Sequence, residues 1–368
     1  MKAPIFSRRA HALWVMVVLL TIHAKAGADS QEYPLGGPLQ VRNLSPFSLL
    51  RMDFMPPPAA ASLKPGWNVE AQFTHANIYA LSANATAYLQ QRDRRAPLSE
   101  RDVQGLLATP RDIFYFDGSI TSLDLVARYV LNKHWTSYVD LPLLYYSGGF
   151  SDSAIEGFHN TFGYGPAGRE LVAQDQYQVL IRSGDDSLAL LAAPSGVQIG
   201  DPVVGLRYAL EFANDGFAIL EGAVKVPVGD EDNYVSSGAL DYGVQLSLQK
   251  QLGRHGVYAS LSDVQIGEAD RFPNGLKDQV TEATVAYEFG FTPHTTAILQ
   301  ASWSRTAFKQ GNIGLSPTEH LASLGVRHRR GKVTYDFALT ENFGDYDNTP
   351  DIAVTFGVSW LLSGVFTD

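Results

Sequence analysis

The alternation of apolar and polar residues between Gly200 and Asp230 constrains the fold most. In the stretch 204–212 every second residue is apolar, and the stretch 217–226 repeats this pattern in reverse after the turn residues 214–216. Successive side chains of a strand point to opposite faces, and Asn-Asp-Gly tolerates the positive φ of a tight turn. The segment therefore predicts a hairpin with one apolar and one polar face. The polar face would carry Arg207, Glu211, Glu221 and Lys225.

Such a hairpin suits either a soluble sandwich or a membrane barrel. The spacing of similar segments along the chain favours the barrel. Tight turns near 133, 215, 254, 293 and 331 alternate with longer loops at 79–120, 146–201, 228–238, 265–278, 306–318 and 342–350. Short turns on one side and long loops on the other are typical of outer-membrane proteins. We predict an all-β fold, a transmembrane antiparallel β-barrel of about 12 strands, with 10–14 as the range because 79–120 is ambiguous.

The N-terminus has the layout of a secretory signal peptide. Basic residues at 2, 8 and 9 precede an apolar run at 12–22 and the small-x-small site Ala24-Lys25-Ala26. The run is shorter than the roughly 20 residues of a spanning helix, so cleavage after residue 26 is expected. The chain contains no cysteine, which excludes disulfides and a lipoprotein anchor. We therefore predict export to the cell outer membrane.

The remaining chain divides into three parts. Residues 27–66 are rich in proline and are expected to be a periplasmic lead-in, or else a plug-like segment. The barrel should span 67–362, with loop insertions at 79–120 and 145–200, before a short tail at 363–368. The last strand alternates apolar residues up to Trp360, as substrates of the outer-membrane assembly machinery do; the plainer interpretation is an ordinary lipid-facing strand. Phe366 leaves open which aromatic residue ends the barrel.

Composition agrees with a membrane barrel. The chain has 33 Gly, 17 Tyr, 19 Phe and 5 Trp, and such abundance accompanies short alternating strands. Without the four basic residues of the predicted signal, 24 basic residues face 38 acidic ones, a net charge of −14. This charge argues against nucleic acid as a partner. The expected partners are outer-membrane lipid, lipopolysaccharide and the assembly machinery, with a monomeric barrel and no cofactor or metal.

Several segments resemble one family. They are Pro38–Pro46, Ser147–Phe150, Ile155–His159 with Phe162-Gly163, Lys225–Asp230 and Ser237–Ala239. In these the chain is similar to an uncharacterised bacterial outer-membrane family labelled domain of unknown function 3187, over nearly the whole mature length. The resemblance implies an outer-membrane barrel and brings no catalytic residues. The chain departs from the family pattern in its larger 79–120 insertion and in its C-terminal tail.

The loop after Tyr145 holds the sharpest chemical candidate. Glu156 and His159 are three residues apart, so in a helix they share one side, where such a pair can bind metal or transfer protons. With Ser151 or Ser153 the histidine would form the kind of site that barrel lipases use. The plainer interpretation, which we favour, is a helical loop whose apolar stripe at 155–162 covers the barrel mouth. No other enzyme signature is present.

The lumen is the other candidate site. By alternation, twelve charged residues should point inward: Glu70, Asp124, Arg128, Arg207, Glu211, Glu221, Lys225, Asp241, Glu282, Glu288, Arg327 and Asp336. Buried charges persist only when paired or hydrated, so we expect salt-bridged networks that partly fill the lumen. The resulting prediction is a narrow channel or transporter for a small solute, capped by the 145–200 loop. The alternatives are a lipid- or lipopolysaccharide-modifying enzyme and a structural or surface-binding barrel.

Two groups of charges lie at the ends of the predicted strands. The acidic residues 230–232, Asp345 and Asp347 begin loops and would either bind Ca²⁺ or form a solvated rim, the latter being favoured. Basic residues collect on the short-turn side: Lys133, His134, Arg254, His255, His294, Arg329, Arg330 and Lys332. They would either meet lipid phosphates or simply solvate the turns.

Overall fold

Twelve antiparallel strands close into a barrel, as predicted. The computed structural model describes residue 33 and residues 35–92, 95–109, 112–162, 168–212, 216–309, 315–344 and 348–362. The predicted signal peptide and the C-terminal tail lie outside these residues. The barrel strands are β1 (Gly66–Leu81), β2 (Ile113–Val130), β3 (Trp135–Ser147), β7 (Val203–Phe212), β8 (Gly216–Lys225), β9 (Asp241–Leu252), β10 (His255–Gln265), β11 (Gln279–Thr292), β12 (Thr295–Arg305), β13 (Thr318–Arg330), β14 (Val333–Asn342) and β15 (Ile352–Leu362).

Each strand pairs with its neighbour, and the first and last strands close the wall. β1 pairs with β15 from Trp67 opposite Leu362 to Asn77 opposite Ile352. The faces follow the alternation of the sequence, since Leu206 is 49% exposed on the outside and Arg207 is 5% exposed on the inside. The outer wall is apolar and the inner wall polar, as a barrel in lipid requires. Among the described residues, no helix is long and apolar enough to span a membrane.

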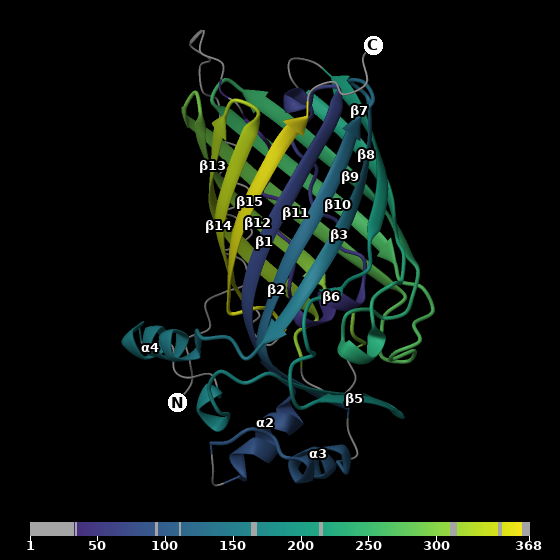
Figure 1. The fold of residues 1–368 in the computed structure, drawn as a ribbon, viewed down its shortest axis with the longest axis vertical. Helices are drawn as coiled ribbons and strands as arrows, with labels where there is room; N and C mark the ends of the chain where they lie inside the picture. Colours follow the sequence, from purple (N-terminus) through teal and green to yellow (C-terminus); the bar gives the residue numbers. More distant parts are fainter. Residues whose placement is uncertain are drawn as a thin grey trace. The chain divides into compact units, whose positions relative to one another are not determined.

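The two ends of the barrel differ. At the short-turn end the hairpins close tightly, with Gly253 and Gly331 in the positive-φ region at φ 59° and 62°. At the long-loop end lie the helices α2 (Ala83–Gln90), α3 (Glu100–Leu107) and α4 (Asp152–Phe162), opposite the tight turns in Figure 1. Short turns face the periplasm in outer-membrane barrels, so the long-loop end is the outer one.

The insertion predicted at 79–120 is shorter than expected. β1 continues to Leu81 and β2 begins at Ile113, because both strands extend beyond the barrel wall. The extension of β2 also pairs with β4 (Gln178–Ser183), which pairs with β5 (Asp186–Leu190); the short β6 (Gln198–Ile199) pairs with β3. Helix α3 starts with a capping box in which Ser99 accepts from the backbone of Asp102.

Tyr33 and residues 35–65, here called the plug, run inside the barrel. The plug starts at the short-turn end, where a Cβ at Gly290 would lie 3.0 Å from the Cβ of Tyr33. It reaches the long-loop end at η1 (Pro46–Leu50), where the Tyr234 hydroxyl donates to the Pro46 carbonyl over 2.9 Å. It then returns to η2 (Ala60–Ser62), whose first amide donates to the Gln249 side chain over 2.8 Å.

The expected periplasmic lead-in is therefore wrong for the described part of 27–66, and the plug-like alternative describes it. The two limbs of the plug bond to each other, because the amide of Ala59 donates to the carbonyl of Gly36 over 2.8 Å. Gly37 lies beside this contact at φ 98°, and a Cβ there would meet the Ala59 nitrogen at 2.4 Å. Only glycine fits a backbone approach this close.

An apolar cluster closes the long-loop end. Phe47 of the plug stacks on Phe308 with ring centroids 4.8 Å apart, and Phe116 packs against Tyr177 and Tyr234. The cover thus comes from η1, the β4–β5 hairpin and the surrounding loops. Helix α4, which was expected to cover the mouth with its stripe, stands to one side in Figure 1. Of its expected stripe, Ile155 is half-buried, while the side chains of Phe158 and Phe162 lie outside the described residues.

Candidate functional site

The contact between the plug and the inner wall concentrates the buried charge of the molecule. Along the barrel strands, the inner wall carries eight buried carboxylates and four buried cations below the β2 extension. These are Glu70, Asp124, Asp140, Glu221, Asp241, Glu282, Glu288 and Glu319, against Arg128, Arg207, Lys225 and Arg327. The plug adds Arg42 and Arg51, which approach the carboxylate-rich middle of the wall.

Arg42 joins the plug to two neighbouring strands. Its Nε contacts the carboxylate of Asp124 on β2, and its Nη2 lies 2.7 Å from the carboxylate of Asp140 on β3. The arginine side chain is 12% exposed and the two carboxylates 0% and 5%. A guanidinium shared between two desolvated carboxylates is a strong contact only while all three partners stay in place.

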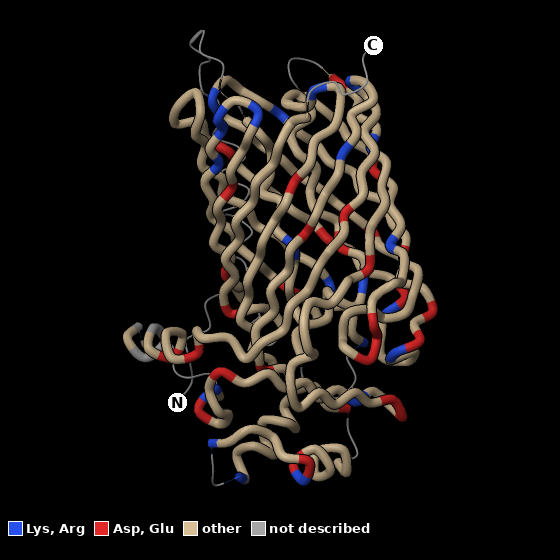
Figure 2. The backbone as a smooth tube through the Cα atoms, viewed as in Figure 1, with Lys and Arg blue, Asp and Glu red and all other residues tan. Residues whose placement is uncertain are grey.

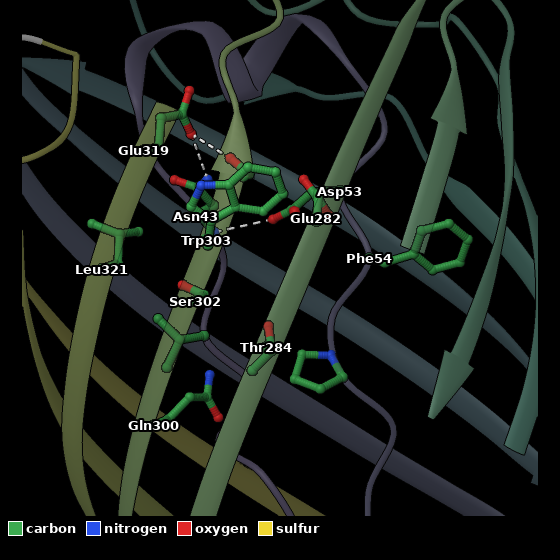
Figure 3. Close-up of a pocket in the computed structure, with 13 residues that line it drawn as sticks. Asn43, Asp53, Phe54, Glu282, Thr284, Gln300, Ser302, Trp303, Glu319 and Leu321 are labelled. Carbon is green, nitrogen blue, oxygen red and sulfur yellow. Dashed lines mark hydrogen bonds between the residues drawn. The ribbon is translucent and has the colours of Figure 1, made fainter. Parts of the chain in front are cut away.

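Arg51 makes the corresponding contact on the other side of the lumen. Its Nη1 pairs with Glu282 on β11 and lies 3.8 Å from Asp53 of the plug itself. Nearby, the Asn43 side chain donates to Glu319 on β13 over 2.9 Å, as drawn in Figure 3. Two strands, β11 and β13, thus hold the plug here through hydrogen-bonded carboxylates.

Glu288 and Arg327 hold the plug closer to the short-turn end. The Glu288 carboxylate accepts from the amides of Gly36 and Gly37 over 3.1 and 2.9 Å. Arg327 donates to the carbonyls of Gly37 and Pro38 over 2.8 and 3.2 Å. Its Nε donates to Asp336 over 2.8 Å. One wall pair thus satisfies both donors and acceptors of the plug backbone, which has no strand partner of its own.

Other predicted lumen residues pair within the wall. Arg207 on β7 lies 2.9 Å from Glu221 on β8, which also accepts from Tyr138 and Gln245 over 2.6 and 3.0 Å. Lys225 lies 2.9 Å from Asp201 and 3.1 Å from Asp241. Asp241 reaches the plug as well, because it accepts from the Met52 amide over 2.8 Å.

The remaining candidates lie apart from this interface. Glu211 is exposed and lines a cavity at the short-turn end. Glu156 pairs with Arg95 and accepts from Gln174 over 2.9 Å, whereas the side chain of His159 lies outside the described residues.

Of the two predicted acidic loops, the one at 230–232 lies within the described residues. Asp230 caps η4 (Glu231–Asn233) and Asp232 pairs with Arg271, while residues 345–347 lie outside the described part. Within the described ranges, no group of three or more His, Cys, Asp or Glu side chains could hold a metal ion.

The free space in the lumen is uneven. Around the middle of the plug, the gaps measure about 40, 20 and 10 Å³. A water needs at least about 10–15 Å³, so these gaps have room for no more than one to a few waters. Two larger cavities, of about 400 and 220 Å³, lie at the short-turn end. The charges of Figure 2 follow the same axis, with Lys and Arg gathered near the tight turns.

Some residues of the interface were missed by the sequence analysis. Arg42, Arg51 and Asp53 lie in a proline-rich segment without periodicity, so the sequence did not predict which way their side chains point. The sequence signal that could have revealed them is that charged residues stand beside apolar residues such as Phe47 in the same segment. Asp140 follows the alternation of β3 and was recoverable, as was Glu319 at the start of β13.

Comparison with known proteins identifies the family. Residues 13–361 match the family described as protein of unknown function (DUF3187). The chain belongs to this family. No curated protein matches the sequence.

Solved structures share the fold. The COG4313 outer membrane channel from Pseudomonas putida F1 is 12% identical, with 81% of this chain and 96% of that chain covered and a TM-score of 0.50. The NanC porin is 8% identical over 80% and 100% of the two chains, with a TM-score of 0.40. The Ralstonia pickettii toluene transporter TbuX is 8% identical over 90% and 96%, with a TM-score of 0.39. At 12% identity, the similarity to the COG4313 channel shows a shared fold alone, that of an outer-membrane β-barrel.

Proposed function

We propose that this member of the DUF3187 family is an outer-membrane channel for a small polar solute, closed by its plug. The observation that carries the proposal is that a separate segment fills the lumen, rather than the side chains of the wall. A barrel of eight strands is filled by its own side chains, whereas sixteen strands leave an aqueous channel. Twelve strands leave a lumen that here contains the plug, which continues into the wall through β1.

The chemistry of the contacts supports a movable plug. The plug buries apolar side chains such as Phe47 at the long-loop end, but its contacts with the middle of the wall include the hydrogen bonds and ion pairs of Arg42, Arg51 and Glu288. Water can replace such partners, whereas it cannot replace apolar packing. The lumen freed by the plug would be lined with charged and amide side chains, which suits a polar solute better than a hydrocarbon.

A disulfide that ties the plug to the wall tests the proposal. The hydroxyls of Ser48 in η1 and Ser304 on β12 both donate to the same Glu319 oxygen, over 3.2 and 2.9 Å. The chain has no cysteine, so Ser48→Cys with Ser304→Cys introduces the only two thiols. We expect solute flux into reconstituted vesicles to fall at least tenfold on oxidation, or on bridging with a one-carbon bis-thiosulfonate, and to return on reduction.

The matched control ties two wall strands and leaves the plug free. Ser247 on β9 and Ser260 on β10 are opposite each other, with their hydroxyls 2.9 Å apart. The pair Ser247→Cys and Ser260→Cys should leave flux unchanged in either redox state. Equal flux before and after closing the Ser48–Ser304 link, or no flux from the reduced protein, would refute the plugged channel.

A further inference from the structure

A cavity at the short-turn end has the features of a ligand site. This basal cavity measures about 400 Å³. Pockets that hold small molecules typically measure about 300–1,000 Å³, so its size is sufficient. Part of its lining belongs to the plug, and the rest belongs to inward-facing positions of β1, β2, β13, β14 and β15 and to the turn between β13 and β14. The cavity therefore lies inside the barrel, at its periplasmic end, and does not face lipid.

The lining carries an excess of positive charge. Five cations and two carboxylates line the cavity: Lys64, Arg128, Arg327, Arg329 and Lys332, with Glu70 and Asp336. The guanidinium group of Arg327 already donates to Glu288, Asp336 and the plug carbonyls. In the described part of the chain, neither the ammonium group of Lys64 nor the guanidinium group of Arg329 has an ion pair or a hydrogen bond.

Arg128 adds an unused donor that is almost fully buried. The residue is 3% exposed, and its Nη1 lies 2.5 Å from Glu70 while its Nη2 donates to Gln40 of the plug over 3.2 Å. Its Nε is buried and has no hydrogen-bond partner among the described atoms. A buried donor without a partner costs about 1–3 kcal/mol, and an anion in the cavity would relieve that cost.

The cavity also has an apolar part. Leu63 of the plug, Val130 on β2 and Leu361 on β15 line it beside the charged residues. Apolar walls with a few convergent charges are typical of sites for small organic ligands, in which the charges fix the orientation. Inorganic anions would use only the charged part.

We propose that the basal cavity binds a small organic anion, with its carboxylate or phosphate head near Arg128 and Arg329 and a short apolar body against Leu63 and Leu361. Arginine is well suited to such heads, because its planar group presents two parallel donors.

The location of the cavity adds a consequence for the plug, which rests on the proposed function. The plug and the wall both contribute to the cavity, so the complete site exists only while the plug is seated. A ligand shifts an equilibrium toward the state that binds it better. A periplasmic anion that fills the cavity therefore stabilises the closed channel.

Binding is tested with three probes of one size. Benzoate, benzyl alcohol and benzylamine carry an anionic, a neutral and a cationic group on the same ring. With the full mature protein in detergent, we expect calorimetry to show saturable binding of benzoate, at least tenfold tighter than that of either other probe. Inorganic phosphate should bind more weakly than benzoate, because it leaves the apolar part empty.

Two variants with the same change of charge locate the site. Arg329→Gln removes a cation that lines the cavity, whereas Arg330→Gln removes its exposed neighbour outside it. Benzoate affinity should fall at least fivefold in the first variant and remain unchanged in the second. Equal binding of benzoate and benzyl alcohol, or equal loss in the two variants, would overturn the site.

The effect on the plug has its own readout. In planar bilayers, benzoate added to the periplasmic face should reduce conductance, and Arg329→Gln should require at least fivefold more benzoate for the same reduction. If benzoate binds as described but leaves conductance unaltered, the coupling to the plug is refuted and the site stands. If the protein binds benzoate and never conducts, the proposed channel fails and the site again stands.

Discussion

Replacing Arg42 with methionine should unseat the plug. Methionine keeps an unbranched side chain of similar reach but removes the charge that lies between Asp124 and Asp140. Breaking a buried ion pair by deleting one partner costs about 3–5 kcal/mol, because the other charge stays buried and unpaired. Here two carboxylates from neighbouring strands would face each other without a cation.

The cost falls on the seated state alone, because leaving the plug out lets water reach both carboxylates. At about 1.4 kcal/mol per factor of ten, a cost of about 3–5 kcal/mol raises the unseated fraction by about two to three and a half orders of magnitude. Single-channel recording should show this as a much higher open probability. Hydrogen exchange at the amides of 35–60 should accelerate to a similar degree.

The matched control is Arg207→Met. Arg207 is also buried and pairs with the carboxylate of Glu221, but both residues belong to the wall. Its loss should lower the stability of the barrel and leave the open probability near that of the unaltered protein. Neutralising both carboxylates together with Arg42, through Asp124→Asn and Asp140→Asn, should restore much of the closed state. If Arg42→Met and Arg207→Met behave alike, the plug is not held by this ion pair.

Two further predictions concern the wall. Removing residues 33–62 removes both plug arginines and leaves eight buried carboxylates against four buried cations on the inner wall, so the open barrel should be cation-selective. A reversal potential in a KCl gradient with the sign of an anion-selective pore would contradict this. Leu206→Arg places a charge on the outer wall, at a cost of about 2–4 kcal/mol near the bilayer midplane, and should reduce the heat-modifiable barrel recovered from outer membranes. Leu252→Arg, on the same face beside a tight turn, should cost only about 0–1 kcal/mol, and equal losses would refute the assigned depth.

The wall could be predicted because strand alternation is a local property. Leu206 and Arg207 are adjacent, and their opposite facing follows from a two-residue period whatever the rest of the chain does. The same period, with the alternation of short turns and long loops, determined twelve strands and which end faces the periplasm. It also placed Glu221, Glu288 and Arg327 on the inner wall before any contact was known.

The tertiary structure alone decided what those inward charges meet. Arg42 contacts Asp124 and Asp140, which are 82 and 98 residues away, and Gly36 bonds to Glu288, 252 residues away. The plug has no periodicity, because its prolines and glycines prevent a regular strand and its polar groups bond to whichever wall residue lies opposite. Those partners come from strands that meet only when β1 pairs with β15, so the sequence determined the wall and closure of the barrel determined how its lumen is filled.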